Sequence, residues 1–213
     1  MALLAGATDV YGLAILRDLF VSFMSGNTTM LGVALGQADW SRARLIAVII
    51  ALFVAGAAAG AAIGEVSGRH HAPSVALTVA LVLAAPLLRP GWAMPAFVLA
   101  MGALNASMTR IGEASISLTY VTGTLVKFGQ GIGHTLSGKP HSWSWMWQAP
   151  MWCSLLAGAV AATLVRRRLG AEALWPLPAY ALILGIAALA TGREGRSHVT
   201  TAPAESGNAS RSN

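Results

Sequence analysis

The sequence predicts an all-α membrane protein with about six spanning helices and two glycine-interrupted segments, arranged as two inverted halves. Three observations lead to this fold class: a low charge content, long uncharged windows, and an internal repeat. Charged residues are 10% of the 213 residues and hydrophobic residues are 55%, whereas soluble domains carry roughly 25% charged residues. A single soluble domain is excluded, because a chain of this length cannot hide so much apolar surface from water.

Uncharged windows of 17 to 26 residues mark where the membrane helices are expected. About 20 apolar residues cross the hydrocarbon core of a bilayer as a helix, so each window is close to one span in length. Basic residues lie mostly at the window edges, where they orient helices against the membrane. The windows are residues 19–38, 45–64, 72–88, 90–109, 140–165 and 173–192.

The first half, residues 1–89, is expected to hold three helices and one interrupted segment. In chain order these are a short helix at about 2–16, the interrupted segment at 19–37, and helices at 42–65 and 73–89. The first helix is short because only sixteen residues precede Arg17, unless the true start lies upstream of Met1. The stripe formed by Gly56, Gly60 and Gly64 has the spacing that lets membrane helices pack closely.

The second half, residues 92–192, repeats this order. Its expected elements are a helix at 93–110, an interrupted segment at 115–135, and helices at 146–166 and 174–192. Pro90 and Gly91 end a helix between the halves. Residues 1–192 therefore form a single membrane domain, and the small polar residues of 193–213 are expected to be a disordered tail.

Three blocks of similar residues occur in the same order in both halves. The pairs are Gly6-Ala7-Thr8-Asp9 with Gly102-Ala103-Leu104-Asn105, Ser25-Gly26-Asn27 with Thr122-Gly123-Thr124, and Ala55-Gly56-Ala57 with Ala157-Gly158-Ala159, at offsets of 96, 97 and 102. Collinear blocks at such a long period indicate an ancient duplication of a half-molecule, not a solenoid of short repeats.

The number of spans depends on the two interrupted segments. If both cross the membrane, there are eight spans and the halves are parallel. If both are broken or re-entrant, each half crosses three times and the halves are inverted. Six spans divide the basic loop residues seven to three between the two sides, and eight spans divide them six to four. The positive-inside rule therefore favours six spans with inverted halves.

Three motifs carry a family resemblance. Residues 6–12 read GATDVYG, residues 20–29 read FVSFMSGNTT, and Gly112-Glu113 is followed by TYVTGTLVK at 119–127. In these motifs the chain resembles the YoaK family, multi-pass bacterial membrane proteins of unknown function. The resemblance covers about residues 3–192 and implies about six spans, but it supplies no substrate. Leu104 departs from the pattern, in which a glutamine is expected before Asn105.

Two ionisable residues are candidates for a functional site because charges at membrane depth are costly. Asp9 is in the middle of the first helix, and Lys127 lies inside the second interrupted segment. A charge at depth needs a partner, so an Asp9–Lys127 pair is attractive. The alternative is that Lys127 snorkels to an interface and Asp9 lies close to one. Asp9 overlays Asn105 in the repeat, so both could line one cavity.

The polar turns of the two interrupted segments supply the other candidate residues, Asn27, Thr28, Thr122 and Thr124. Glycine tolerates unusual backbone angles, and Ser, Thr and Asn can bond to freed backbone groups, so helices are expected to break at or next to Gly26 and Gly123. Interrupted segments at matching places in two halves are a sequence pointer to a transport site. The alternative is that these groups only cap helix ends.

The lead hypothesis is a small-solute transporter or channel in the cytoplasmic membrane, with a midplane polar site between the two repeat halves. The competing hypothesis is a non-transporting membrane scaffold or regulatory subunit. An enzyme is not expected, because no nucleophile, phosphate-loop or metalloprotease motif occurs. Neither a cofactor nor a metal site is implied, since the five histidines lack ligand spacing. The expected partners are the lipid bilayer and an unknown small solute, not nucleic acid, and a homo-oligomer is left open.

Overall fold

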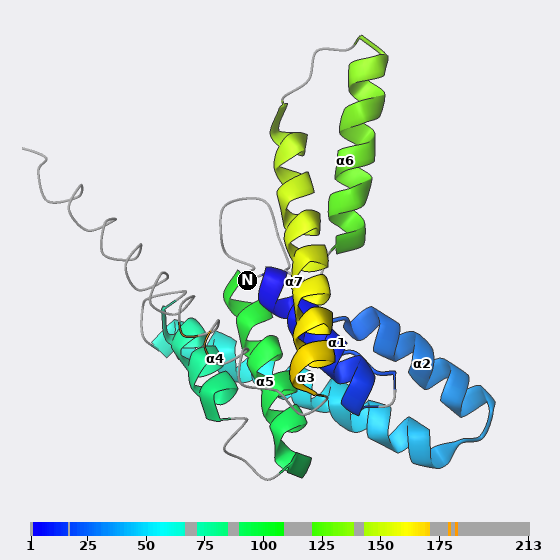
Figure 1. Cartoon of the computed structure of the whole chain (residues 1–213), viewed down its shortest axis with the longest axis vertical. Helices are drawn as coiled ribbons and strands as arrows, with labels where there is room; N and C mark the ends of the chain where they lie inside the picture. Colours follow the sequence, from blue (N-terminus) through cyan, green and yellow to red (C-terminus); the bar gives the residue numbers. More distant parts are fainter. Residues whose placement is uncertain are drawn as a thin grey trace, which may run out of the picture.

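The computed structural model describes residues 2–16, 18–66, 72–84, 90–108, 121–138, 143–170, 179 and 182, and within these ranges every regular element is a helix. The elements are α1 (Ala2–Ile15), α2 (Met24–Gly36), α3 (Trp40–Val66), α4 (Ala72–Ala84), α5 (Pro90–Met108), α6 (Val121–Leu136), the 3₁₀ helix η2 (Trp143–Trp147) and α7 (Gln148–Leu169) (Figure 1). The prediction of an all-α protein is therefore confirmed.

Most helices lie within a few residues of the helix ranges that the sequence predicts. At the first interrupted segment α2 begins at Met24 instead of at residue 19, and residues 109–120, in and before the second interrupted segment, lie outside the described residues. Residues 85–89 before the second half, the helix predicted at 174–192 apart from residues 179 and 182, and the tail at 193–213 fall outside the described residues. Pro90 and Gly91, which were predicted to end a helix, form the first turn of α5.

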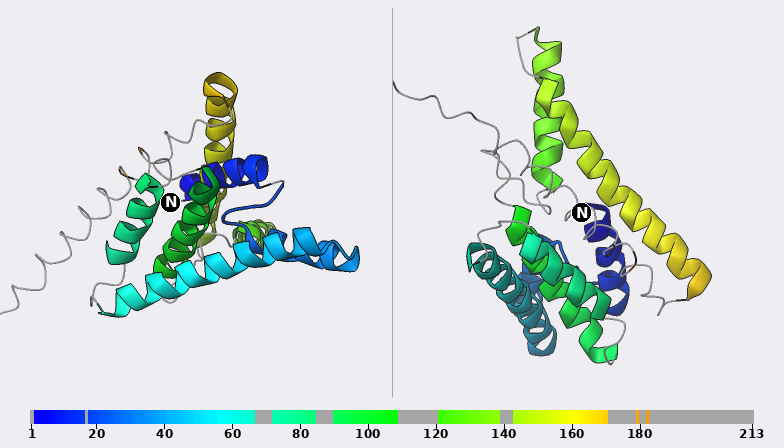
Figure 2. Two further views of the ribbon diagram at one scale, coloured as in Figure 1. Left: turned by 90° about the horizontal axis from the view of Figure 1, so that it is seen from below. Right: turned by 90° about the vertical axis from the view of Figure 1, so that its left-hand side faces the viewer.

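Two pairs of closely packed helices organise the molecule, α1 on α7 and α5 on α3 (Figures 1 and 2). Glycines make both crossings tight. A methyl group on Gly6 would overlap the carbonyl oxygen of Leu155, and one on Gly158 would overlap the carbonyl oxygen of Leu3. Close backbone approach through small residues is how helices associate where lipid removes the hydrophobic drive between them.

Glycines also make the crossing of α5 on α3 tight. A methyl group on Gly102 would overlap the carbonyl oxygen of Phe53, and one on Gly56 would overlap that of Leu99. Gly60 extends the crossing along α3, where it lies against the backbone of Ala103. The predicted packing role of the glycine stripe on this helix is thus confirmed for Gly56 and Gly60.

The two crossings are equivalent under the internal repeat. Adding 96 to α1 positions turns Leu3 and Gly6 into Leu99 and Gly102, the residues at the second crossing. Subtracting 102 from α7 positions turns Leu155 and Gly158 into Phe53 and Gly56 in the same way. Each half therefore contributes one helix to each pair, so the halves interlock instead of lying side by side.

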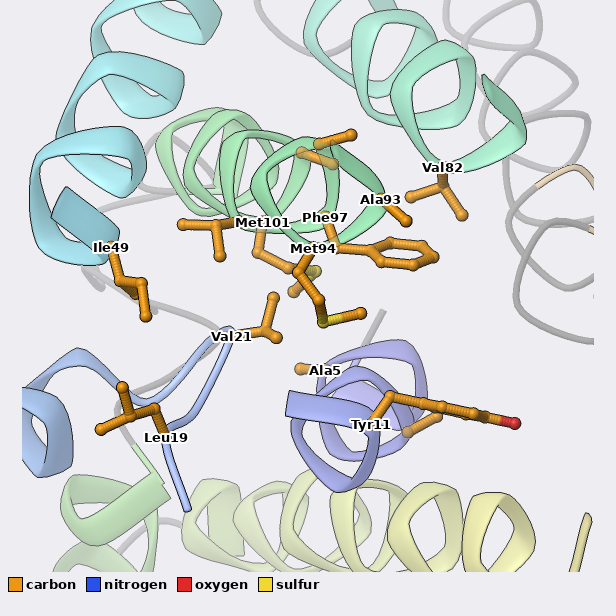
Figure 3. Packing of buried hydrophobic residues seen from close by; sticks show 14 of the residues in the cluster. Ala5, Tyr11, Leu19, Val21, Ile49, Val82, Ala93, Met94, Phe97 and Met101 are labelled. Atoms are coloured by element: carbon orange, nitrogen blue, oxygen red, sulfur yellow. The ribbon is translucent and has the colours of Figure 1, made fainter. Parts of the chain in front are cut away.

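A hydrophobic cluster fills the space between α1, α3, α4 and α5 (Figure 3). Met94 and Met101 of α5 reach toward α1, and Val21 lies between them and Ala5. Phe97 and Tyr11 are the largest side chains that are fully buried. Burial of Val21 in this cluster fixes the connection between α1 and α2, which carries the candidate site.

In the part of the chain that the structure describes, two helices are long and apolar enough to cross a membrane, Trp40–Val66 and Trp145–Leu169, and two shorter apolar helices are Ala2–Ile15 and Trp92–Ala106. The long helices expose rows of aliphatic side chains, for example Val48 on α3 and Val160 on α7, as expected for lipid contact. In the left panel of Figure 2, α3 lies across the view while α7 runs up the view. The described helices are thus not all parallel, and the count of six spans remains a prediction.

Candidate functional site

The candidate site is built around the strap, our name for residues 19–23, which connects α1 to α2 without helical structure. Its side chains divide between two sides. Leu19 and Val21 are completely buried in the hydrophobic cluster, whereas Phe20 and Ser22 line a cavity on the other side. Core packing therefore decides which strap side chains face the cavity.

The carboxylate of Asp9 on α1 holds the middle of the strap. The backbone N–H groups of Val21 and Ser22 donate to Asp9 Oδ1 at 2.8 and 2.6 Å, and the Ser22 hydroxyl donates to Oδ2 at 2.7 Å. Gly12 lets the strap lie directly on α1, because a methyl group there would press on the backbone of Leu19 and Val21. Hydrogen bonds to a carboxylate are roughly twice as strong as neutral ones, so Asp9 is the principal anchor of the strap.

Asn27 on α2 holds the strap at Phe20. Its Oδ1 accepts the Phe20 N–H at 2.9 Å, and its Nδ2 donates to the Phe20 carbonyl oxygen at 2.8 Å. The Asn27 side chain is completely buried, so these bonds satisfy backbone groups that no helix pairs. The strap is thus held by one polar side chain from each of the helices that flank it, Asp9 of α1 and Asn27 of α2.

A cavity of about 340 Å³ lies between α1, the strap, and the second-half helices α6 and α7. Its polar side chains are Asp9 and Ser22 from the first half and Thr122 from the second. The remaining lining residues are Gly6, Val10, Leu13, Phe20, Phe23, Val121, Leu155 and Ala159. A mainly apolar chamber with a few convergent polar groups is typical of sites for small molecules.

The rings of Phe20 and Phe23 form one wall of this cavity. They meet edge to face, with centroids 5.2 Å apart and planes at 87°. Both rings also border a second hollow of about 320 Å³, which Ser25, Gly26, Thr29 and Met30 complete. The aromatic pair therefore stands between the Asp9 cavity and a hollow lined by the first polar motif.

Gly26 does not break a helix, and this corrects the prediction made for it. It lies in the first turn of α2, and the non-helical residues are those of the strap and Asp18 before it. A methyl group on Gly26 would press on the rings of Phe23 and Phe20, so glycine is needed to seat the aromatic pair. Gly123 likewise lies in the first turn of α6, and residues 109–120 before it are outside the described residues.

The structure brings together only part of the predicted site. Asp9 and Thr122 line one cavity, as predicted, and Asn27 lies behind its wall as a tie to the strap. Thr28 is exposed, and its hydroxyl donates to the carbonyl oxygen of Met24 one turn earlier. Thr28 therefore lies outside the cavity, and its hydroxyl bonds within α2 instead of capping the helix end.

The predicted pair of Asp9 and Lys127 is not formed. Lys127 is exposed on α6 and does not line the cavity, so the prediction that it faces the interior is wrong. Asp9 is satisfied instead by the strap, whose N–H groups and serine hydroxyl replace a cationic partner. The long side chain of Lys127 is free to extend toward an interface, as the snorkelling alternative proposed.

Asn105 and Thr124 lie apart from the cavity lining. Asn105 is buried in α5, where its Nδ2 donates to the carbonyl oxygen of Met101 at 2.9 Å. The Thr124 hydroxyl donates to the carbonyl oxygen of Val121 at 2.7 Å, within the first turn of α6. The described residues therefore do not place Asn105 in one cavity with Asp9.

Sequence reasoning missed Ser22 and the aromatic pair. The sequence offers only a weak signal, a polar Ser22 that follows apolar Leu19, Phe20 and Val21. Composition does not distinguish the strap, because its five residues lie inside a longer apolar window. Within the described residues there is no group of three His, Cys, Asp or Glu side chains that could hold a metal ion.

Replacing Asn27 by alanine should lower the free energy of unfolding by about 2 to 4 kcal/mol, because it leaves the Phe20 N–H and carbonyl without partners. Thermal unfolding of the detergent-solubilised protein, followed by tryptophan fluorescence, measures this effect. Thr28→Ala is the matched control next to it and should change stability by less than about 0.5 kcal/mol. Equal effects of the two substitutions would mean that Asn27 does not hold the strap.

Comparison with known proteins gives two matches. Residues 1–187 match the model of the family described as protein of unknown function, DUF1275. The chain is also similar to UPF0700 transmembrane protein RA0705 of Rhizobium meliloti (strain 1021), with 40% identity over 197 residues that cover 92% of this chain and 87% of the relative. No solved structure matches the chain. The matches confirm a membrane protein of an uncharacterised family, and neither of them carries the YoaK name.

Proposed function

Since the chain belongs to the DUF1275 family, whose description assigns no activity, we propose its function from the geometry of the Asp9 cavity: the protein carries a small polar solute across the cytoplasmic membrane. One observation carries the proposal. The cavity brings together one polar residue from each interrupted segment, Ser22 and Thr122, and adds Asp9 of α1. Such convergence at the interface of two repeats is the arrangement found at transport sites.

The proposed path runs from the hollow beside Ser25 and Thr29, past the rings of Phe20 and Phe23, into the Asp9 cavity. Rotation of the two rings would connect the hollows without moving a helix. A cavity of about 340 Å³ has room for a solute of a few heavy atoms to about twenty, given that drug-sized ligands occupy roughly 300–1,000 Å³. Asp9 and Thr122 would orient the solute, while Asn27 keeps the strap in place.

The proposed topology is multi-pass, with six spans and inverted halves. It is supported by the seven-to-three division of basic loop residues and by the equivalence of the two glycine crossings. An exchange that maps half one onto half two, and half two onto half one, is a twofold operation, and the charge division favours an axis in the membrane plane, as inverted repeats require. The proposal assigns no catalytic step to the protein.

The competing proposal is a membrane scaffold or regulatory subunit without transport activity. It is supported by the tight glycine crossings of α1 on α7 and α5 on α3, which would serve a purely structural protein equally well. The two proposals differ in whether water and solute reach Thr122. They can therefore be separated without knowing the solute.

A cysteine at position 122 should react with a charged, membrane-impermeant thiol reagent in sealed vesicles. The only cysteine of the chain, Cys153, is first replaced by serine. Because thiolates form in water and not in lipid, Thr122→Cys should react about tenfold faster or more than Leu125→Cys on the same helix, which is also exposed but does not line the cavity. Equal and slow labelling of both positions would favour the scaffold.

Transport itself is measured as uptake of a panel of radiolabelled small polar solutes, or as current, in reconstituted vesicles. Asp9→Asn should abolish this activity more than it lowers expression, because the side-chain shape is kept while its charge is lost. Activity that Asp9→Asn leaves unchanged would contradict the assignment of Asp9 to the site.

A further inference from the structure

We infer that Asp9 is a proton-binding site in the cavity, and that protonation there releases the strap. The inference rests on the proposed function only in that the cavity must be open to water. It begins from the position of the carboxylate, which lies in α1 with three strap donors on one side and the cavity on the other. Ionisable side chains within membrane segments are typical of ion pathways and proton relays.

The helices packed around the site bring no charge to the cavity. The described parts of α2 and α5 have no ionisable side chain, and those nearest on α6 are Lys127, which is exposed, and His134 farther along the helix. On α7 the charges begin at Arg166, whose guanidinium lies 5.8 Å from the ring centre of Tyr11. Asp18, beside the strap, is exposed and does not line the cavity. Asp9 is thus the one charged group among the cavity-lining side chains.

The geometry favours a proton over a metal ion. Asp9 Oδ1 already accepts two N–H groups, so only Oδ2 retains acceptor capacity toward the cavity. A bound Na⁺ or Ca²⁺ needs about six oxygen ligands, whereas the lining offers three oxygen-bearing side chains, Asp9, Ser22 and Thr122. A proton needs one lone pair, which Oδ2 provides.

Proton binding changes the hydrogen bonds between Asp9 and the strap. A hydronium ion in the cavity transfers its proton to Oδ2 and leaves as water, and the new O–H donates to Ser22 Oγ, whose own hydrogen must turn away. The bonds from Val21 and Ser22 to Oδ1 then end on a neutral acid and lose roughly half of their strength. The strap is weakened at its centre while Asn27 still holds Phe20. Because Phe20 and Phe23 are part of the strap, protonation of Asp9 also loosens the hold on the aromatic pair.

Two measurements on the protein reconstituted in lipid test the inference, and neither needs a solute. Infrared difference spectra between alkaline and acidic pH should show the C=O band of a protonated carboxylic acid that Asp9→Asn abolishes and Asp18→Asn retains. Hydrogen exchange at the amides of Val21 and Ser22, corrected for intrinsic rates, should become about tenfold faster or more on acidification in the wild-type protein. In Asp9→Asn the corrected rates should not depend on pH.

Ser22→Ala provides a second variant if Asp9→Asn does not fold. It keeps the carboxyl group but removes its Oδ2 partner, so the carboxylic-acid band should be retained at a shifted frequency. Absence of the band, or strap exchange that is the same at both pH values, would overturn the inference. The band and the exchange report on the proton site alone, whereas cysteine labelling at position 122 and vesicle uptake report on transport. A failed transport proposal is therefore distinguishable from a failed proton site.

Discussion

Gly102→Ala should destabilise the protein by about 3 kcal/mol, although alanine is the better helix former. The added methyl group would overlap the carbonyl oxygen of Phe53, which belongs to the α3 backbone and cannot rotate away as a side chain can. The helices must separate, and the Gly56 contact on the same crossing is lost with them. Gly6→Ala should have a similar effect at the equivalent crossing of α1 on α7.

Matched controls lie on α2 and α6. Gly32 and Gly129 are helical glycines with open space where a methyl group would go. Alanine at either position should stabilise the protein by about 0.5 to 1 kcal/mol, because it reduces the conformational freedom of the unfolded chain. Thermal unfolding followed by the fluorescence of the seven tryptophans measures both the destabilisation at Gly102 and the stabilisation at Gly32 or Gly129. Shifts of the same sign at Gly102 and Gly32 would contradict the crossing geometry.

Asp9→Ala is expected to be nearly as damaging, with a loss of about 3 kcal/mol or more. Three donors lose their acceptor at once, the N–H groups of Val21 and Ser22 and the Ser22 hydroxyl. Ser22 is buried, so water replaces the carboxylate poorly. Thermal unfolding of the purified protein gives the magnitude.

Two further variants isolate the cause of this loss. Asp9→Asn keeps one acceptor oxygen and should lose only about half as much stability. Asp18→Ala removes an exposed carboxylate that lies between α1 and the strap. It should change stability by less than about 0.5 kcal/mol. If Asp9→Ala and Asp18→Ala behave alike, the carboxylate of Asp9 does not hold the strap.

The helices could be predicted from the sequence because their signal is local. The helix ranges predicted at 42–65, 93–110 and 146–166 match α3, α5 and α7 within a few residues, since hydropathy reflects the solvent around each stretch. The repeat also matched Gly6 with Gly102 and Gly56 with Gly158 correctly. It could not show that these glycines meet across the halves, because a repeat relates positions in the chain and not positions in space.

The site was predictable only in part, for the same reason. Asp9 and Thr122 stand out as polar residues in apolar surroundings, and they do line one cavity. Lys127 stands out equally, but its long side chain can reach an interface, and no local pattern distinguishes the two outcomes. The strap escaped prediction because its acceptors, Asp9 and Asn27, lie on the helices before and after it.

The interlocked pairing of α1 with α7 also bears on how the chain is assembled during synthesis. Gly6 leaves the ribosome long before Leu155, its neighbour in the folded protein. At about 5 to 20 residues per second, α1 waits on the order of ten seconds for its partner helix. During that interval its glycine face must be shielded by lipid or by the insertion machinery, so neither half can complete its packing before the other has been made.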